Sequence, residues 1–334
     1  MKKIKKIATK STKEKKLISL KSFAEKLFNE KSVALVCHVR PDGDTIGSTC
    51  ALKCALESAG IKTEVFCADE IPSRFFFLEK VKEIKNKLTE DEFSAFVAVD
   101  CADITRLGTF ASKFSKCKNT YSIDHHVSND HFAKTNYVCD SASNCENIYQ
   151  LLQVANVKID KEIANFLAMG IMTDTGGFRH KNVTATTLSI AASLAGKGAD
   201  LNKISYYMFT MQSKERALLF SKAMSSIRYF HGDKVAIAVV EYKDFLSTKA
   251  KQDETEGFID FLMGISTVEI GICLSETEKN KFKVSFRSKG ADVNAVASRF
   301  GGGGHIHASG CKINGDKEEI IDKLQFVAGQ YIEE

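Results

Sequence analysis

Apolar runs and helical stretches alternate along the first two hundred residues. Four short runs are mostly apolar without polar alternation, which is typical of strands buried on both faces. The strands are expected at 33–38, 63–66, 93–99 and 121–123, and the helices at 47–59, 144–154, 161–172 and 184–195. This order predicts an α/β fold with a parallel sheet between two layers of helices.

A second pattern of elements begins near residue 230. Strands and helices follow one another differently there, which predicts a second, smaller α/β domain. The strands are expected at 234–240, 267–274 and 281–287, and the helices at 254–262, 292–299 and 316–332. The predicted parts are a Lys-rich segment at 1–20, a parallel-sheet domain at 21–196, a helical linker at 197–225 and the second domain at 226–334.

Positive charge is concentrated at the start of the chain. Residues 1–16 contain eight Lys and one Glu, whereas the remaining residues contain 39 basic and 41 acidic side chains. A nearly neutral body offers no extended basic face for long nucleic acid. The Lys-rich start is most simply a solvated terminus, and contact with RNA or a membrane surface is the alternative.

Neither a membrane protein nor a secreted protein is indicated. The chain has no run of about 18 apolar residues, and Lys21 and Lys26 break the only apolar pieces near the start, so no signal-peptide core exists. The ten Cys include no C-x-x-C pair. We expect reduced thiols in a cytoplasmic protein without a membrane partner. The oligomeric state is left open, with a homodimer as one option.

Ionisable side chains gather after the first predicted strand. His38, Asp42 and Asp44 follow it directly, and Gly43 allows a tight turn between the two Asp residues. Ligands of open α/β sheets bind beyond the carboxyl ends of the strands, so these side chains can face one crevice. Taken alone, the motif fits an ordinary Asp-Gly turn with a nearby His equally well.

Three further groups follow other predicted elements. Asp100 and Asp174 each come after an apolar element, and Asp124, His125 and His126 end the fourth strand. Asp100 alone fits an ordinary loop, and Asp174 alone fits a cap or turn. Three adjacent ionisable residues after an apolar run are harder to explain by packing.

Together these groups predict a site for two divalent cations. Like charges in one crevice cannot all stay ionised, so the carboxylates would repel one another strongly without cations. Carboxylate and imidazole ligands suit Mn²⁺ or Mg²⁺ better than a thiolate zinc site does. Two ions about 3.5–4 Å apart can hold the oxygens of a phosphoryl group during in-line displacement. The chemistry favoured by these residues is phosphoester hydrolysis.

A run of four glycines, Gly301–Gly304, precedes His305. Glycine tolerates positive φ and close backbone approach, so the N–H groups of such a run can face a phosphate. A lone glycine run is usually a flexible loop. Arg287 and Ser288, at the end of a predicted strand, strengthen the interpretation as an anion site because Arg can bind phosphate through two hydrogen bonds.

These motifs resemble those of the DHH phosphoesterase superfamily and of its DHH-associated C-terminal domain, in the same order and with similar spacing. The matching segments are His38-Val-Arg-Pro-Asp42-Gly-Asp44, Val99-Asp100, Asp124-His125-His126, Thr173-Asp174-Thr175-Gly176 and Gly301 to Gly310. The resemblance spans residues 30–330. It is strongest to the branch of nanoRNases and pAp phosphatases, which cleave RNA fragments of a few nucleotides and dephosphorylate 3′-phosphoadenosine 5′-phosphate (pAp).

The resemblance implies a role for each residue. The implied metal ligands are His38, Asp42 and Asp100 for one ion, which Mn²⁺ suits best, and Asp44, Asp100, His125 and Asp174 for the other. His126 would contact the scissile phosphate, and Asp124 would orient the His pair. The implied substrate-binding residues are Arg287, Ser288, Gly303, Gly304 and His305. The expected partners are short RNA oligonucleotides or nucleotide substrates.

Other functions share parts of this pattern. A linear or cyclic dinucleotide phosphodiesterase has the same metal motifs and is the main alternative. A RecJ-like exonuclease is disfavoured because the body is not basic and no further OB-type domain is indicated. The Gly301–Gly310 pattern disfavours an inorganic pyrophosphatase, and the complete set of expected ligands disfavours a non-catalytic RNA-binding module.

Overall fold

The computed structural model describes residues 17–88 and 93–332. Most of the Lys-rich segment predicted at 1–20 lies outside these residues. The chain divides into two compact units after Met211. None of the helices in the described part combines the length and the apolar composition that a membrane span needs.

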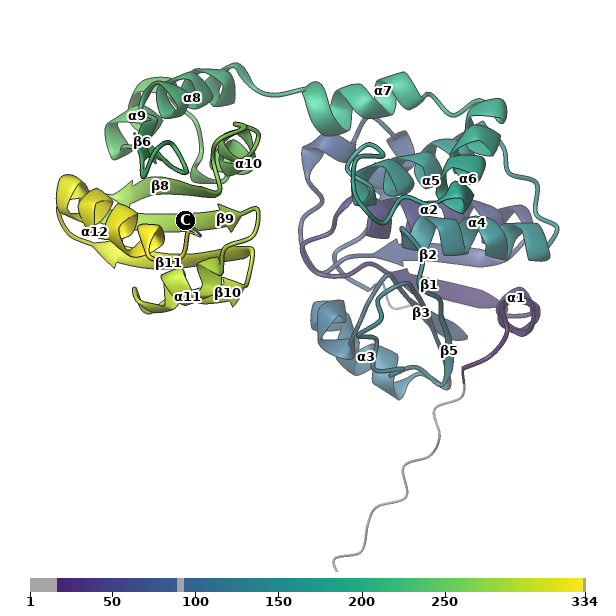
Figure 1. Ribbon diagram of the computed structural model, residues 1–334. Helices are drawn as coiled ribbons and strands as arrows, with labels where there is room; N and C mark the ends of the chain where they lie inside the picture. The colour runs from purple at the N-terminus through teal and green to yellow at the C-terminus, as the bar shows by residue number, and fades with distance from the viewer. Residues whose placement is uncertain (1–16, 89–92, 333–334) are drawn as a thin grey trace, which may run out of the picture. The chain divides into compact units, whose positions relative to one another are not determined.

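The first unit contains a five-stranded sheet in which every pair of neighbouring strands is parallel. The strands are β1 (Ser32–Val36), β2 (Lys62–Phe66), β3 (Ala95–Val99), β4 (Asn119–Asp124) and β5 (Thr135–Val138). Their order is β2-β1-β3-β4-β5 (Figure 1). The chain steps outward from β1 to β2 and then continues on the other side of β1, so the topology switches between β1 and β3. The predicted parallel sheet is confirmed.

Helices cover both faces of this sheet (Figure 1). The larger layer holds α1 (Leu20–Leu27), α2 (Gly43–Ser58), α4 (Asn144–Val154), α5 (Lys161–Asp174) and α6 (Ala185–Gly196). The smaller layer consists of the 3-10 segment η3 (Ile104–Phe110) and α3 (Ala111–Lys116). Short helical turns complete the unit at η1 (Ser73–Phe75), η2 (Glu79–Glu83), α7 (Leu201–Ser205) and η4 (Tyr206–Thr210).

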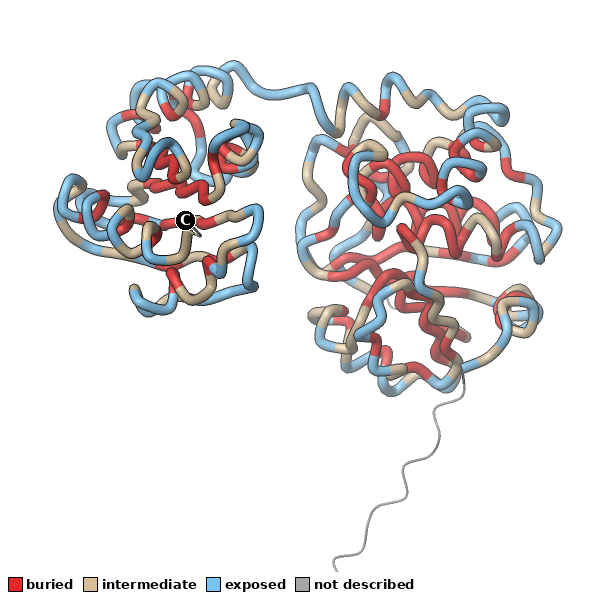
Figure 2. The backbone as a smooth tube through the Cα atoms, in the orientation of Figure 1, coloured by how far each residue is buried: buried red, intermediate tan, exposed pale blue. Residues whose placement is uncertain are grey.

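Alternate residues of the strands pack into two separate cores, one on each face of the sheet. Leu35 packs among the helices of the larger layer, whereas its neighbour Val36 packs with Phe110 and Phe114 of the smaller layer. Successive side chains of a strand point to opposite faces, so a strand that is apolar at every position fills both cores. Figure 2 shows the buried positions concentrated in the strands and in the helix sides that face them.

The second unit contains a six-stranded mixed sheet of order β10-β11-β9-β8-β7-β6, in which only β7 and β8 are parallel. The strands are β6 (Arg228–Phe230), β7 (Val235–Val240), β8 (Ile270–Glu278), β9 (Lys281–Ser288), β10 (Gly303–His305) and β11 (Ala308–Asn314). The helices are α8 (Lys214–Ser225), α9 (Tyr242–Thr248), η5 (Gln252–Thr255), α10 (Phe258–Met263), α11 (Val293–Ser298) and α12 (Lys317–Gly329). Cores on both faces of the sheet hold this unit together.

Several elements of both units differ from the sequence expectation. Sequence periodicity missed β5, β6, β10 and β11, which are short or interrupted by polar residues and glycine. The helix expected at 254–262 is divided into η5 and α10 because Gly257 adopts a left-handed φ of 82°. The glycine run is not a free loop, since Gly303 and Gly304 belong to the edge strand β10.

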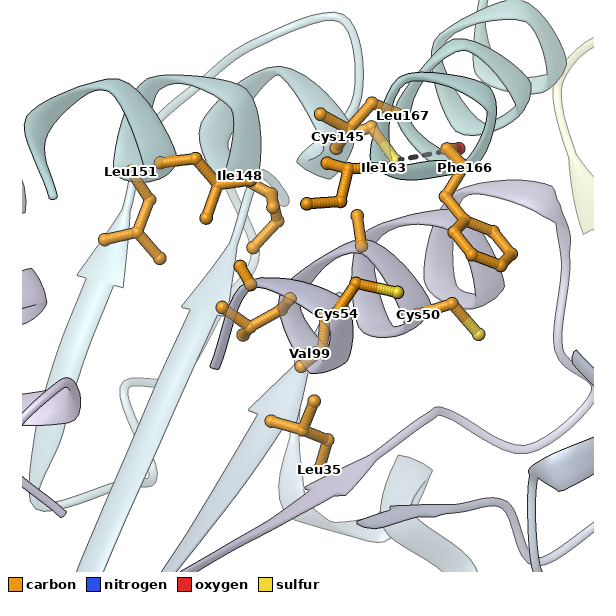
Figure 3. Close-up of a cluster of buried hydrophobic side chains, with 14 of the residues drawn as sticks. Leu35, Cys50, Cys54, Val99, Cys145, Ile148, Leu151, Ile163, Phe166 and Leu167 are labelled. Atoms are coloured by element: carbon orange, nitrogen blue, oxygen red, sulfur yellow. Dashed lines mark hydrogen bonds between the residues drawn. The ribbon is translucent and has the colours of Figure 1, made fainter. Parts of the chain in front are cut away.

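Two glycines let α2 and α5 approach closely. A Cβ atom at Gly47 of α2 would lie 2.5 Å from the carbonyl oxygen of Phe166, and one at Gly170 of α5 would lie 2.7 Å from Asp44 Oδ1. Figure 3 shows the apolar side chains that fill the space between these helices, α4 and the strands beneath, among them Ile148, Phe166 and Val99. This close approach fixes Asp44 against α5.

We expect Gly47→Ala to destabilise the protein by about 1–3 kcal/mol, because the added methyl group overpacks the helix contact and outweighs the better helix propensity of Ala. Urea denaturation measures the change. Gly196→Ala in α6 is the matched control, since a Cβ atom there has no neighbour within 4 Å. Equal midpoints for the two variants would contradict the tight packing of α2 on α5.

Candidate metal centre

The carboxyl edge of the first sheet collects the predicted ligands. His38 follows β1, Asp100 follows β3, and Asp124 ends β4. Because β1, β3 and β4 are neighbours in the sheet, these three positions lie side by side. Asp42 caps the N-terminus of α2 with its side chain, and Asp174 is the last residue of α5.

His38, Asp42 and Asp100 form one cluster of potential ligand atoms. His38 Nε2 lies 3.5 Å from Asp42 Oδ2 and 3.6 Å from Asp100 Oδ2. The Nδ1 atom of the same ring lies 2.9 Å from the carbonyl oxygen of Val39. A carbonyl oxygen only accepts, so Nδ1 carries the proton and Nε2 faces the carboxylates, which is how His binds a metal.

A second cluster contains Asp44, His125 and Asp174. His125 Nε2 lies 3.6 Å from Asp174 Oδ2, 3.9 Å from Asp44 Oδ2 and 3.4 Å from Asp100 Oδ1. The Nδ1 atom of His125 lies 3.0 Å from the carbonyl oxygen of Ser141. The ring of His125 is therefore held with Nε2 toward the carboxylates, as the ring of His38 is.

Asp100 joins the two clusters through its two oxygens. Its Oδ2 atom faces His38, and its Oδ1 atom faces His125. Oδ1 is buried and accepts no hydrogen bond from any residue that the structure describes. A buried carboxylate oxygen without a donor is costly unless a cation fills that role. The donor set and this orphaned oxygen fit two divalent cations that share Asp100.

Asp124 is buried and already fully hydrogen-bonded. Its Oδ1 atom accepts from the His125 N–H at 2.9 Å and from His126 Nδ1 at 2.8 Å, and its Oδ2 atom accepts from Asn129 Nδ2 at 2.6 Å. Burial raises the pKa of Asp124, but the hydrogen bonds from His126 and Asn129 outweigh it and lower that pKa. Asp124 therefore holds the ring of His126 and the backbone of His125, whereas Ser141 holds the ring of His125.

Asp44 lies wholly inside the protein, at the start of α4. Its oxygens accept from the backbone N–H groups of Asn144 at 2.5 Å and Cys145 at 2.9 Å. The exposed N–H groups of a helix N-terminus stabilise a carboxylate. The sequence expectation did not include this contact, because α4 begins 100 residues later in the chain.

In the second unit, the predicted substrate residues lie on neighbouring strands. Arg287 of β9 stands opposite Ala308 of β11, which stands opposite His305 of β10. Residues directly opposite one another point to the same face of a sheet, so Arg287 and His305 share one face. Ser288 Oγ donates to the carbonyl oxygen of Ala291 at 2.5 Å.

The backbone of the glycine run is largely used within the protein. Gly301 and Gly302 donate their N–H groups to the carbonyl oxygens of the α11 residues Ser298 and Ala297, and Gly304 donates to Asn294 Oδ1 at 2.8 Å. The expectation of a run of free N–H groups is therefore wrong for these three glycines. A Cβ atom at Gly304 would lie 2.6 Å from the carbonyl oxygen of Ala308, so the tight hairpin itself requires glycine there.

Comparison with known proteins assigns both units. Residues 32–171 match the model of the DHH family N-terminal domain, and residues 232–334 match that of the DHHA1 domain. Over 302 residues the chain is 30% identical to the bifunctional oligoribonuclease and PAP phosphatase NrnA of Thermus thermophilus, with 88% of each chain covered. The chain belongs to the DHH family.

Other DHH relatives extend this result. The NrnA protein of Bacillus subtilis, which bears the same bifunctional description, is 27% identical over 290 residues, covering 84% of this chain and 89% of that protein. The fold matches the crystal structure of an exopolyphosphatase-related protein from Bacteroides fragilis with a TM-score of 0.81, at 24% identity and with 93% and 96% of the two chains covered. Family membership and the carboxylate–His clusters identify a metal-dependent phosphoesterase.

Two side chains at the DHH site were missed by the sequence analysis. Asn129 donates to Asp124 and to the carbonyl oxygen of Cys101. Arg106, in the 3-10 segment η3 after β3, places Nη2 3.3 Å from His38 Nδ1. The only sequence signal was a single amide and a single basic residue shortly after the acidic motifs, which is too common to interpret.

In the metal-free protein, the closely spaced charges of the DHH site change the pKa values of its side chains. Burial and then the charges of Asp44 and Asp100 raise the pKa of Asp174 to about 9. Burial opposes charging of His38, but its hydrogen bonds to Asp100 and Asp42 prevail and raise its pKa to about 10. Protons thus replace cations when no metal is bound.

We expect the metal-free protein to lose stability as the pH rises. Asp174 and His38 both bind protons more tightly in the folded than in the unfolded protein. Their contribution to the free energy of unfolding is therefore complete at pH values below their unfolded pKa values. It is lost as the pH rises through about 9 for Asp174 and about 10 for His38. The Tm of EDTA-treated protein should fall from about pH 5 to about pH 9, and excess Mn²⁺ should raise Tm most at the alkaline end because it replaces the protons. Asp174→Asn should flatten the metal-free slope, and identical slopes with and without Mn²⁺ would contradict the charge crowding.

Proposed function

We propose that this chain is a two-metal phosphoesterase that hydrolyses very short oligoribonucleotides and pAp. The observation that carries the proposal is the pair of ligand clusters joined by the two oxygens of Asp100. The bifunctional description of the relatives from Thermus thermophilus and Bacillus subtilis supports the choice of substrates. Near-complete coverage of both relatives supports the same division into a DHH part and a DHHA1 part.

The DHH unit would hold two divalent cations, for which we propose Mn²⁺. The proposed ligands are His38, Asp42 and Asp100 for one ion, and Asp44, Asp100, His125 and Asp174 for the other. Two such ions supply a water activated for attack and neutralise charge on the phosphoryl oxygens. The protein supplies fixed ligands, since hydrogen bonds hold both His rings and the buried Asp44 carboxylate in place.

His126 is the proposed acid at the scissile phosphate. Its Nδ1 atom donates to Asp124, which leaves Nε2 free, and its side chain is 43% exposed. The hydrogen bond to Asp124 raises the pKa of His126 despite partial burial. A protonated ring can donate from Nε2 to a phosphate oxygen or to the leaving oxygen.

The proposed substrate-binding residues of the DHHA1 unit are Arg287, Ser288, Gly303, Gly304 and His305. Gly304 would contribute a close approach of the backbone and not its N–H, which donates to Asn294. The shared sheet face of Arg287 and His305 supports this role. Within the described part of the chain, the guanidinium of Arg287 makes one hydrogen bond, from Nη1 to the carbonyl oxygen of Phe286. Its remaining donors can bind a phosphate, which Arg does through two parallel hydrogen bonds.

A substrate panel tests the proposed function. Purified protein with Mn²⁺ is offered end-labelled RNA of two to twenty nucleotides, pAp and a linear diadenylate. We expect rapid hydrolysis of the shortest RNAs and of pAp, and none by Asp100→Asn, which removes the shared charge. Preference for the longest strands, or hydrolysis of the diadenylate alone, would overturn the proposal.

We expect His126→Ala to keep both metals yet lose about 10²-fold or more in kcat, the usual scale for a positioned acid–base group. Metal content is measured by mass spectrometry on the same samples that are assayed. Asp100→Asn is the contrasting variant, because it should lose metal as well as rate. Loss of metal from His126→Ala would make His126 a ligand rather than an acid.

Arg287→Ala should raise KM for short RNA and pAp, since it removes a contact that binds ground and transition states alike. A small activated phosphodiester without a nucleotide should be hydrolysed at the wild-type rate. Arg299→Ala, at an exposed position just after α11, controls for loss of charge in the same unit. An equal loss on the nucleotides and on the small diester would refute substrate binding by Arg287.

A further inference from the structure

Arg106 is fixed beside His38 by the backbone around it. Its carbonyl oxygen accepts the Val39 N–H at 2.8 Å, which ties η3 to the residue next to His38. Asp103 caps the same segment by accepting the Thr105 N–H at 2.7 Å. Gly108 kinks it with a positive φ of 56°, and a Cβ atom at this position would lie 2.7 Å from Ala68. The position of Arg106 is therefore set by the fold.

The guanidinium of Arg106 is not consumed by its contact with His38. Nη2 lies 3.3 Å from His38 Nδ1, but Nδ1 donates its own proton to Val39. Arg only donates hydrogen bonds, so a nitrogen that carries a proton cannot accept from it. In residues 17–88 and 93–332, no carboxylate lies within 4.0 Å of the Arg106 nitrogens. Arg106 is thus a half-buried cation that makes no ion pair with a carboxylate among the described residues. The charge of Asp103 acts on it from further away, and its guanidinium contacts the ligand candidate His38.

The balance of charge among the carboxylates, the metal ions and a bound phosphoryl group indicates a role for Arg106. The two clusters joined by Asp100 contain the carboxylates of Asp42, Asp44, Asp100 and Asp174, which two divalent cations would neutralise. The neighbouring carboxylate of Asp124 is paired with His126. The phosphoryl group of a substrate then brings negative charge that these ions do not balance. A guanidinium held beside the ligands supplies that charge and offers paired donors to phosphate oxygens.

We propose that Arg106 is a phosphate-binding residue of the DHH unit, which donates to a non-bridging oxygen of the substrate's phosphoryl group. This inference rests on the proposed function and deepens it. It explains why a strong cation is held next to His38 without a carboxylate to pair with. Arg179, the Arg that follows Asp174, differs because its Nε atom donates to the carbonyl oxygen of Gly176 at 2.6 Å.

The alternative role for Arg106 is to orient His38 for metal binding. The two roles make opposite predictions for metal affinity. Loss of a phosphate contact leaves Mn²⁺ affinity unchanged, whereas loss of an orienting contact lowers it, as the loss of such outer contacts usually does.

The test uses full-length Arg106→Met and Arg106→Lys, with Arg74→Met as the control. Arg74 is an exposed Arg of the same unit, whose guanidinium stacks on Phe75. For Arg106→Met we expect kcat/KM on pAp to fall about 10- to 100-fold, the range for one hydrogen bond to a charged group. Arg106→Lys should recover part of this loss, since Lys keeps the charge but not the paired donors.

Calorimetry supplies two readouts that do not depend on turnover. Mn²⁺ affinity of Arg106→Met should equal that of wild type, and the affinity of the Mn²⁺-loaded protein for inorganic phosphate should fall. Weaker Mn²⁺ binding with wild-type rates at saturating Mn²⁺ would overturn the inference in favour of an orienting role, and unchanged phosphate affinity would also overturn it. A wild-type protein that binds phosphate through Arg106 but leaves pAp and short RNA intact would instead refute the proposed function alone.

Discussion

The repulsion among closely spaced carboxylates at one sheet edge is the constraint on which the DHH unit depends. The parallel sheet brings β1, β3 and β4 together, and their ends deliver the acidic side chains to one place. Without cations, burial and the neighbouring carboxylates raise the pKa of Asp174. The surrounding structure is built to hold these charges in position. Helix α4 supplies N–H groups to Asp44, and Asn129 supplies an amide to Asp124.

The packing of the helices also serves this edge of the sheet. Asp44 lies in α2 and Asp174 in α5, and the two helices approach closely at Gly47 and Gly170. A wider separation would move Asp44 away from Asp174, with which it shares one cluster of potential ligand atoms. The core and the site are thus parts of one arrangement, and a change in core packing changes the positions of the carboxylate and His side chains in the site.

The sequence was most informative where a single physical requirement, such as burial on both faces, selects a single type of residue. Strands that fill two cores, such as β3, are apolar at every position and were predicted from that alone. The edge strand β5 was not predicted because it contains Asn136, a polar but buried residue whose side chain forms hydrogen bonds with the backbone of Ala133. The acidic and His motifs could be predicted because several of them follow strand ends. The N–H groups that bind Asp44 and the place of Arg106 could not, since tertiary packing alone brings these distant segments together.

The backbone conformation of Asp100 limits which amino acids can occupy this position. Its φ of 60° lies in the left-handed region, which Asp and Asn tolerate better than other residues with a side chain. Its two oxygens must also face two separate clusters. Glu has the charge but not the conformational tolerance, and Asn has the tolerance but not the charge. Of these three residues, only Asp combines the charge, the reach and the backbone tolerance that this position requires.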